Sequence, residues 1–92
     1  VSKTDDDIQN YIKIYPNPVT DILQIDHIAN DKINEISLFD FTGKLIYKNE
    51  SINQQNISLN MSETGIQSQG IYMLKIGAGT KTWYKKILVS MY

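Results

Sequence analysis

Hydrophobic and polar residues alternate in short runs along most of the chain. The clearest run places Ile57, Leu59 and Met61 at every second position, with polar residues between them. A period of two is typical of a β-strand that has one buried face and one solvated face. Asn, Asp, Gly and Pro interrupt the runs, and no stretch has the spacing of an amphipathic helix. The pattern predicts strands at residues 11–15, 22–26, 35–41, 45–48, 56–61, 70–76 and 81–90.

These strands predict an all-β fold. They follow one another at intervals of about ten to fifteen residues without an intervening helix, whereas parallel neighbours need long crossover connections. We therefore expect an antiparallel immunoglobulin-like β-sandwich of about seven strands. A small barrel fits the same pattern, so the order of the strands stays open.

Proline and glycine residues mark the turns. Residues 16–18 predict a rigid corner after the first strand, because proline fixes φ and lacks a backbone donor. Residues 42–44 predict a hairpin turn, and residues 77–80 predict another before the last strand. Residues 1–10 carry too little apolar surface to offset the entropy of ordering. We expect a linker at 1–10 and one domain at 11–92.

Composition excludes several classes of protein. Hydrophobic residues make up 41% of the 92 residues and charged residues 21%, which is typical of a folded soluble domain. There is no cysteine, which excludes disulfides, thiolate metal sites and a catalytic thiol. No apolar run approaches the roughly 20 residues of a transmembrane helix, so we expect no membrane span.

Charge is unevenly distributed although the net charge is only −1. Residues 1–63 contain all ten acidic residues and five lysines, whereas residues 64–92 contain four lysines and no acid. The basic end would suit an acidic partner, but lysines also commonly fill the solvent face of strands. The chain has no arginine, which argues against a nucleic-acid partner.

Candidate catalytic and ligand-binding groups are scarce. His27 is the sole histidine, which excludes metal sites built from several histidines, and we expect it at the surface. The glycines at 77–79 precede no helix, so they do not form a phosphate-binding loop. We therefore expect no catalytic residue, metal or cofactor. The tyrosines and Trp83 leave one alternative, a carbohydrate-binding or adhesive module, which would need exposed rings in a line.

Three motifs in a fixed order resemble the type A C-terminal sorting domain of the type IX secretion system (Por secretion system) of Bacteroidetes. The first motif is Tyr15-Pro16-Asn17-Pro18, the second is Gly70-Ile71-Tyr72, and the third is Lys85-Lys86-Ile87-Leu88-Val89. The hairpin turn around Gly43 also looks like the central hairpin of the family. The resemblance covers residues 11–92.

The resemblance implies a secretion signal and not an enzyme. An upstream cargo would be covalently linked to the domain, which would be recognised in the periplasm and carried across the outer membrane to the cell surface or medium. Its partners would be the translocon and the outer-membrane shuttle or sortase components, with cleavage within or before residues 1–10.

The resemblance also assigns roles to residues. Lys85, Lys86, Ile87, Leu88 and Val89 would form the recognised signal. An edge strand offers unpaired backbone groups to a partner, so we expect these residues at an open edge. The other motif residues would mainly shape the fold: Tyr15, Pro16, Asn17, Pro18, Gly43, Gly70 and Tyr72.

Overall fold

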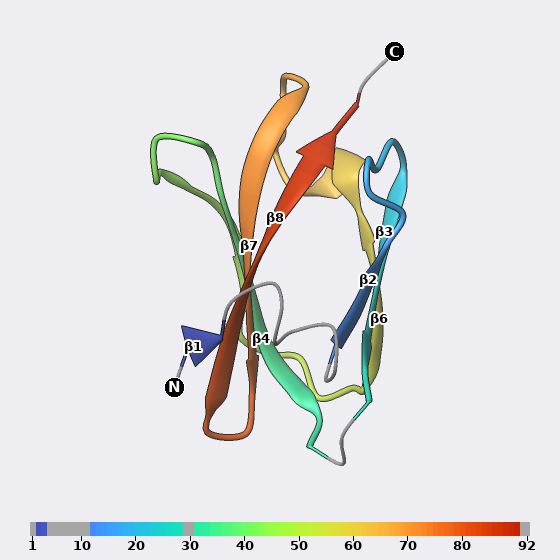
Figure 1. The fold of residues 1–92 in the computed structure, drawn as a ribbon, viewed down its shortest axis with the longest axis vertical. Coiled ribbons are helices and arrows are strands. Elements are labelled where there is room, and N and C mark those ends of the chain that lie inside the picture. Colours follow the sequence, from blue (N-terminus) through green and yellow to red (C-terminus); the bar gives the residue numbers. More distant parts are fainter. Residues whose placement is uncertain (1, 4–11, 29–30, 91–92) are drawn as a thin grey trace.

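Two facing β-sheets make up the molecule (Figure 1). The structure is a computed structural model that describes residues 2–3, 12–28 and 31–90. One sheet has the order β1-β8-β7-β4-β5, with bounds Ser2–Lys3 (β1), Lys81–Val89 (β8), Gly70–Ala78 (β7), Ile33–Phe39 (β4) and Leu45–Asn49 (β5). The other has the order β2-β3-β6, with bounds Ile12–Tyr15 (β2), Ile22–His27 (β3) and Asn56–Asn60 (β6). A short 3₁₀-helix, η1, covers Met61–Glu63.

The predicted β-sandwich is confirmed, and the strand order is immunoglobulin-like. Neighbouring strands pair antiparallel, apart from the parallel pair β1 and β8. The sheet β2-β3-β6 faces β8, β7, β4 and β5, a division of strands typical of immunoglobulin-like sandwiches, with β5 beside β4. The two sheets are distinct, so the barrel does not form.

Alternating side chains fill the core between the sheets. Leu23 and Ile25 point inward from β3, and Ile36 and Leu38 point inward from β4, as the period of two predicts. All four side chains are fully buried. Each contributes roughly 1.5–3 kcal/mol by leaving water.

The predicted surface position of His27 is wrong. The alternation of β3 continues one residue beyond the predicted strand, so His27 falls on the same inward face as Leu23 and Ile25. The buried imidazole packs against Trp83 with ring centroids 5.3 Å apart. Its Nδ1 donates a hydrogen bond to the backbone carbonyl of Asp31.

Several strand ends also differ from the prediction. β7 continues through Gly77 and Ala78, which pair with Thr82 and Lys81, so the turn shortens to residues 79–80. Gly79 has a φ of 64°, which suits a tight hairpin turn. β4 begins two residues early, at Ile33, and ends at Phe39, and the predicted last residue of β6 instead begins η1.

Part of the predicted linker is ordered as β1. Ser2 pairs with Thr82 and Lys3 pairs with Trp83, so β1 lies beside the first half of β8. Residues 1 and 4–11 lie outside the described part of the chain. The linker at residues 1–10 and the domain boundary after it stay predictions.

Candidate functional site

The C-terminal motif divides into buried and exposed residues along β8. Ile87 and Val89 point into the core and are fully buried. Lys85 is half-buried and lies opposite the buried Leu74, on the inner side of the sheet. Lys86 and Leu88 are exposed and point away from the core. Only part of the predicted recognition motif is therefore accessible to a partner's side chains.

The proline corner, residues 15–18, lies beside the end of β8. There the Asn17 side chain makes the backbone hydrogen bonds that a neighbouring strand would otherwise make. The side-chain Nδ2 of Asn17 donates to the carbonyl oxygen of Lys86 at 3.4 Å, and its Oδ1 accepts from the amide of Leu88 at 2.9 Å. One amide side chain thus pairs with two backbone groups, as a neighbouring strand would. The bonds preceding Pro16 and Pro18 are both cis.

The backbone after the corner continues this pairing. The amide of Val19 donates to the carbonyl of Leu88 at 2.9 Å, and the amide of Ser90 donates to the carbonyl of Val19 at 2.8 Å. The expectation of an open edge is therefore wrong between residues 86 and 90, because the corner occupies backbone groups there. A partner adding a strand at this position would first have to displace the corner.

The second motif packs against the third. Gly70 pairs with Val89, and Tyr72 pairs with Ile87, so both motifs lie side by side on β7 and β8. Gly70 has a φ of 149°, a conformation that side-chain-bearing residues rarely adopt. The buried ring of Tyr72 places its hydroxyl to donate to the carbonyl of Ser68 at 2.6 Å, which holds the preceding loop.

The central hairpin is closed by Asp40. Its Oδ1 accepts from the amides of Thr42 at 2.9 Å and Lys44 at 3.0 Å. The hydrogen bond from the Thr42 hydroxyl, together with these amides, lowers the pKa of the Asp40 carboxyl. Gly43 has a φ of 91°, which a turn glycine adopts easily. The Asp40 carboxylate therefore stabilises the hairpin turn.

The fold brings the three motifs together at one end of the sandwich (Figure 1). The corner contacts β8 on one edge, and β7 pairs with β8 on the other. At the start of the corner, Tyr15 donates its hydroxyl to Asp26 Oδ2 at 2.7 Å, which raises the pKa of the tyrosine. The residues that the sequence singled out thus share one structural unit, built around the C-terminal half of β8.

In the part of the chain that the structure describes, the tyrosines and Trp83 do not form a line of exposed rings on which sugars could stack. Trp83 is 1% exposed and Tyr72 is also buried. Tyr47 and Tyr84 are half-buried and lie on different faces of the sheet, while Tyr15 stands exposed at the corner. Tyr11 lies outside the described residues. Among the described residues, no group of three or more His, Asp or Glu is placed to hold a metal ion.

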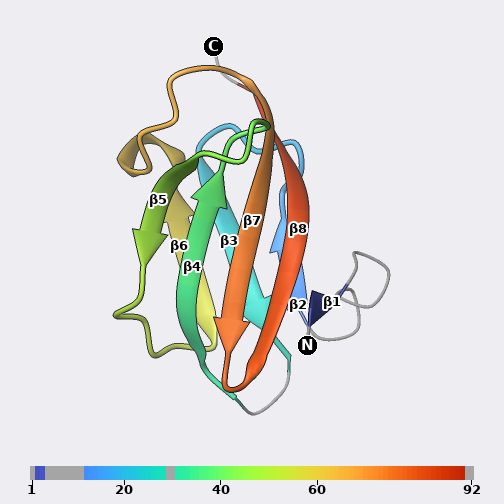
Figure 2. The ribbon, with the colours of Figure 1, turned by 90° about the vertical axis from the view of Figure 1, so that its left-hand side faces the viewer.

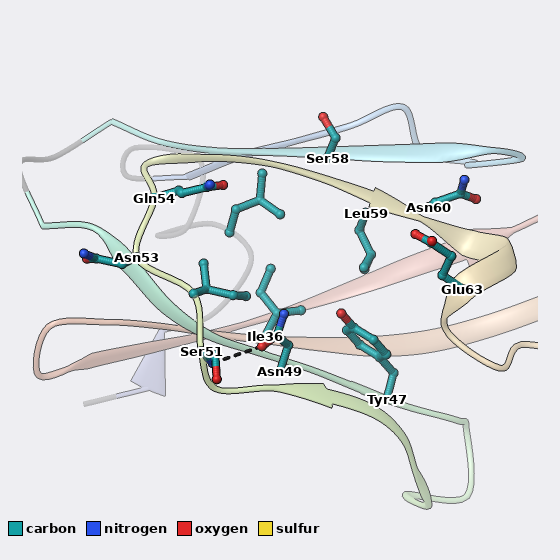
Figure 3. A pocket seen from close by; sticks show the side chains of 12 residues that line it. Ile36, Tyr47, Asn49, Ser51, Asn53, Gln54, Ser58, Leu59, Asn60 and Glu63 are labelled. Carbon is teal, nitrogen blue, oxygen red and sulfur yellow. Dashed lines mark hydrogen bonds between the residues drawn. The ribbon is translucent and has the colours of Figure 1, made fainter.

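A hollow of about 260 Å³ opens between the sheets where β5 and β6 leave the sandwich edge uncovered (Figure 3). Its floor includes the apolar side chains of Ile36 and Leu59, and Tyr47 and several amides surround it. The carbonyl oxygen of the Asn49 side chain accepts from the amide of Ser51, and that of Asn60 accepts from the amide of Ser62. The side chains of Asn49 and Asn60 therefore stabilise the adjacent turns.

Comparison with known families gives one match over most of the chain. Residues 13–90 match the family model described as secretion system C-terminal sorting domain. A search of the curated proteins finds no match. None of the helices in the described residues is long and apolar enough to cross a membrane.

Solved structures share the fold. One is PorZ, an essential bacterial surface component of the type-IX secretion system of Porphyromonas gingivalis, with a TM-score of 0.64 and 20% identity over 89% of this chain. The match spans 12% of the PorZ chain. Another is the sulfur carrier protein SoxY from Chlorobium limicola f thiosulfatophilum, with a TM-score of 0.52 and 14% identity, covering 100% of this chain and 83% of that chain. At these identities the similarity concerns the fold alone.

Proposed function

Because the chain belongs to the family of secretion system C-terminal sorting domains, we propose that it directs a covalently linked upstream cargo across the outer membrane. The family is one of type IX secretion signals and not of enzymes. Membership implies export to the cell surface or release from the cell, and a partner within the secretion system. The cargo and the individual components that handle the domain are part of the proposal.

The arrangement around the end of β8 is the observation that best supports this function. Asn17, Gly70 and Leu88 come from three separate motifs and meet in one hydrogen-bonded unit. A sorting signal must be distinguished from the many unrelated proteins of the periplasm. A folded unit that joins distant segments offers a shape that an unfolded C-terminal tail would not.

The proposed partners are the translocon and an outer-membrane shuttle or sortase. We place the signal in residues 85–89, together with the corner and Gly70 that hold them. Cleavage by the sortase would fall within or before residues 1–10, which would separate the cargo from the folded domain. Ser2–Lys3 lie beside the first half of β8, so a cut near this segment would fall on the same strand as the proposed signal but toward its other end.

A reporter that carries its own export signal to the periplasm tests the function. We expect residues 1–92 fused behind it to send the reporter to the surface or medium of a Bacteroidetes host, and to leave it in the periplasm of a strain lacking the type IX system. The same reporter without the domain is the control. Periplasmic retention in the intact host would contradict the proposal, and the mass of the exported reporter would show whether cleavage falls at or before Asn10.

A further inference from the structure

Strands β8, β7, β4 and β5 lie side by side in the five-stranded sheet (Figure 2). The side chains on the outer face of this sheet divide into a polar half and an apolar half. In the polar half, Lys75 pairs with Glu35 at 3.6 Å, and the Ser37 hydroxyl donates to the same carboxylate at 3.0 Å. Lys48, opposite Ser37, pairs with Glu50 at 3.5 Å. The charged groups of this half therefore have partners within the domain.

The apolar half lies toward the hairpin between β4 and β5. Phe41 is 84% exposed, Ile71 is 49% exposed and Leu88 is 44% exposed. Large apolar side chains are seldom left in water as a contiguous group unless a partner covers them. A groove of about 480 Å³ runs across this surface. The groove is lined mainly by Phe39, Phe41, Ile71, Met73, Tyr84 and Lys86.

Strand register places the exposed residues of two motifs next to each other. Ile71 lies opposite Leu88, and Met73 lies opposite Lys86. Their neighbours in sequence, Tyr72 and Ile87, have buried side chains that point into the core. The accessible parts of the Gly70-Ile71-Tyr72 and Lys85–Val89 motifs are therefore one continuous surface and not two separate signals.

The charge of this surface favours an acidic partner. Lys86 lines the groove and makes no ion pair with any described residue. Asp40 also borders the groove, but its Oδ1 already accepts hydrogen bonds from the hairpin turn. The nearby strands β7 and β8 carry lysines and no acidic residue. A carboxylate on the partner would find the Lys86 ammonium group, which has no ion-pair partner in the described part of the chain, at the edge of an apolar groove.

We propose that this surface, formed by Phe39, Phe41, Ile71, Met73, Tyr84, Lys86 and Leu88 and here called the apolar face, is where a secretion-system protein recognises the folded domain. The occupant is an extended segment of that protein with an apolar side chain for the groove and a carboxylate for Lys86. The apolar face has seven residues, against roughly 20–30 a side in a stable interface, so the contact is transient, as passage of a cargo requires. The inference rests on the proposed function and adds the surface and the chemistry of the partner.

The chain offers a matched control for this proposal. Ile22 is also 49% exposed, also lies on a strand, and belongs to the opposite sheet. We expect Ile71→Ser to lower the exported fraction of the reporter about tenfold with accumulation in the periplasm, the effect of losing one anchoring side chain of an interface. Leu88→Ser should lower the exported fraction by a similar factor. The Ile22→Ser reporter should be exported to the same extent as the parent. Thermal unfolding of each purified domain checks that all three variants fold.

Charge reversal tests the second element of the partner's chemistry. Lys86→Glu should lower export by a similar factor, whereas Lys32→Glu, at an exposed position outside the strands, should not. Normal export of the folded Ile71→Ser, Leu88→Ser and Lys86→Glu variants would overturn the proposal and leave the sorting function standing. Retention of the parent fusion would instead refute the sorting function itself.

A second copy of the domain is the competing occupant. Sedimentation velocity of the parent domain should show a monomer at micromolar concentration. A dimer that Ile71→Ser dissociates without any change in export would assign the apolar face to self-association and would overturn the proposal.

Discussion

Asn17 joins two parts of the chain that are 71 residues apart at its contact with Leu88. The flanking prolines have no backbone N–H to offer a neighbouring strand, and the Asn17 side chain supplies a donor and an acceptor in their place. Its role is therefore structural in the first instance. By holding Lys86 and Leu88 at the edge of β8, it also keeps the exposed residues of the C-terminal motif in place.

Replacing Asn17 should measure the strength of this connection. Asn17→Ala removes both side-chain hydrogen bonds to β8 and should lower the free energy of unfolding by about 1 kcal/mol, since the site is exposed to water. Asn17→Asp keeps an acceptor for the Leu88 amide but loses the donor to Lys86. Its free energy of unfolding should therefore fall by less than that of the alanine variant. Urea unfolding gives both values. If the alanine variant is as stable as the parent, the two hydrogen bonds contribute no net free energy, because hydrogen bonds to water replace them at no cost.

At the scale of elements, periodicity predicted most of the strands. The alternation that placed Leu23 and Ile25 on one face of their strand, and Ile57 and Leu59 on one face of theirs, is found in the structure, where the four residues share the inner face of one sheet. Such patterns are local, because successive residues of a strand point to opposite sides. The ends of strands were less predictable. Glycine and alanine at 77–78 suit a turn by composition, but pairing with β8 extends the strand through them.

Contacts between distant segments could not be predicted from the pattern of hydrophobic and polar residues. Nothing in the local sequence indicates that Asn17 takes the place of a strand beside Leu88, because that contact depends on how the two sheets are arranged. The parallel pairing of β1 with β8 and the burial of His27 against Trp83 also depend on how distant strands are arranged in space. The motifs identified the residues of the candidate site, whereas the fold determined which of them are exposed.

The hairpin between β4 and β5 should respond to pH through Asp40. Hydrogen bonds from Thr42 and Lys44 lower the pKa of its carboxyl in the folded state. A lowered folded-state pKa gives stability that is present above the unfolded-state value, roughly 4, and is lost as the pH falls through the folded-state value. Asp40→Asn keeps an acceptor oxygen but has no charge to titrate.

Chemical unfolding of the parent and Asp40→Asn domains between about pH 2 and 6 checks this expectation. The parent should be the more stable at pH 6, and its advantage should shrink steadily on acidification. An advantage that stays constant over this range would mean that the Asp40 charge does not contribute to closing the turn.

On the scale of the whole molecule, Trp83 joins the two sheets. It extends inward from β8 in the five-stranded sheet and meets the ring of His27, at the end of β3 in the three-stranded sheet. A domain of this size buries only about 60–65% of its unfolded surface, so one large buried ring is a substantial part of its core. The same burial removes Trp83 from any sugar-stacking role.

Trp83→Ala should therefore destabilise the whole fold. Loss of a buried tryptophan costs about 3–5 kcal/mol, which is much of the roughly 5–15 kcal/mol that holds a small domain together. The neighbouring Tyr84 is half-buried on the outer face, and Tyr84→Ala should cost about 1 kcal/mol. Urea unfolding followed by far-ultraviolet circular dichroism compares the two variants. If Trp83→Ala instead keeps its stability to within about 1 kcal/mol of the parent, the packing of Trp83 against His27 does not hold the sheets together, and an exposed, ligand-stacking tryptophan again becomes tenable.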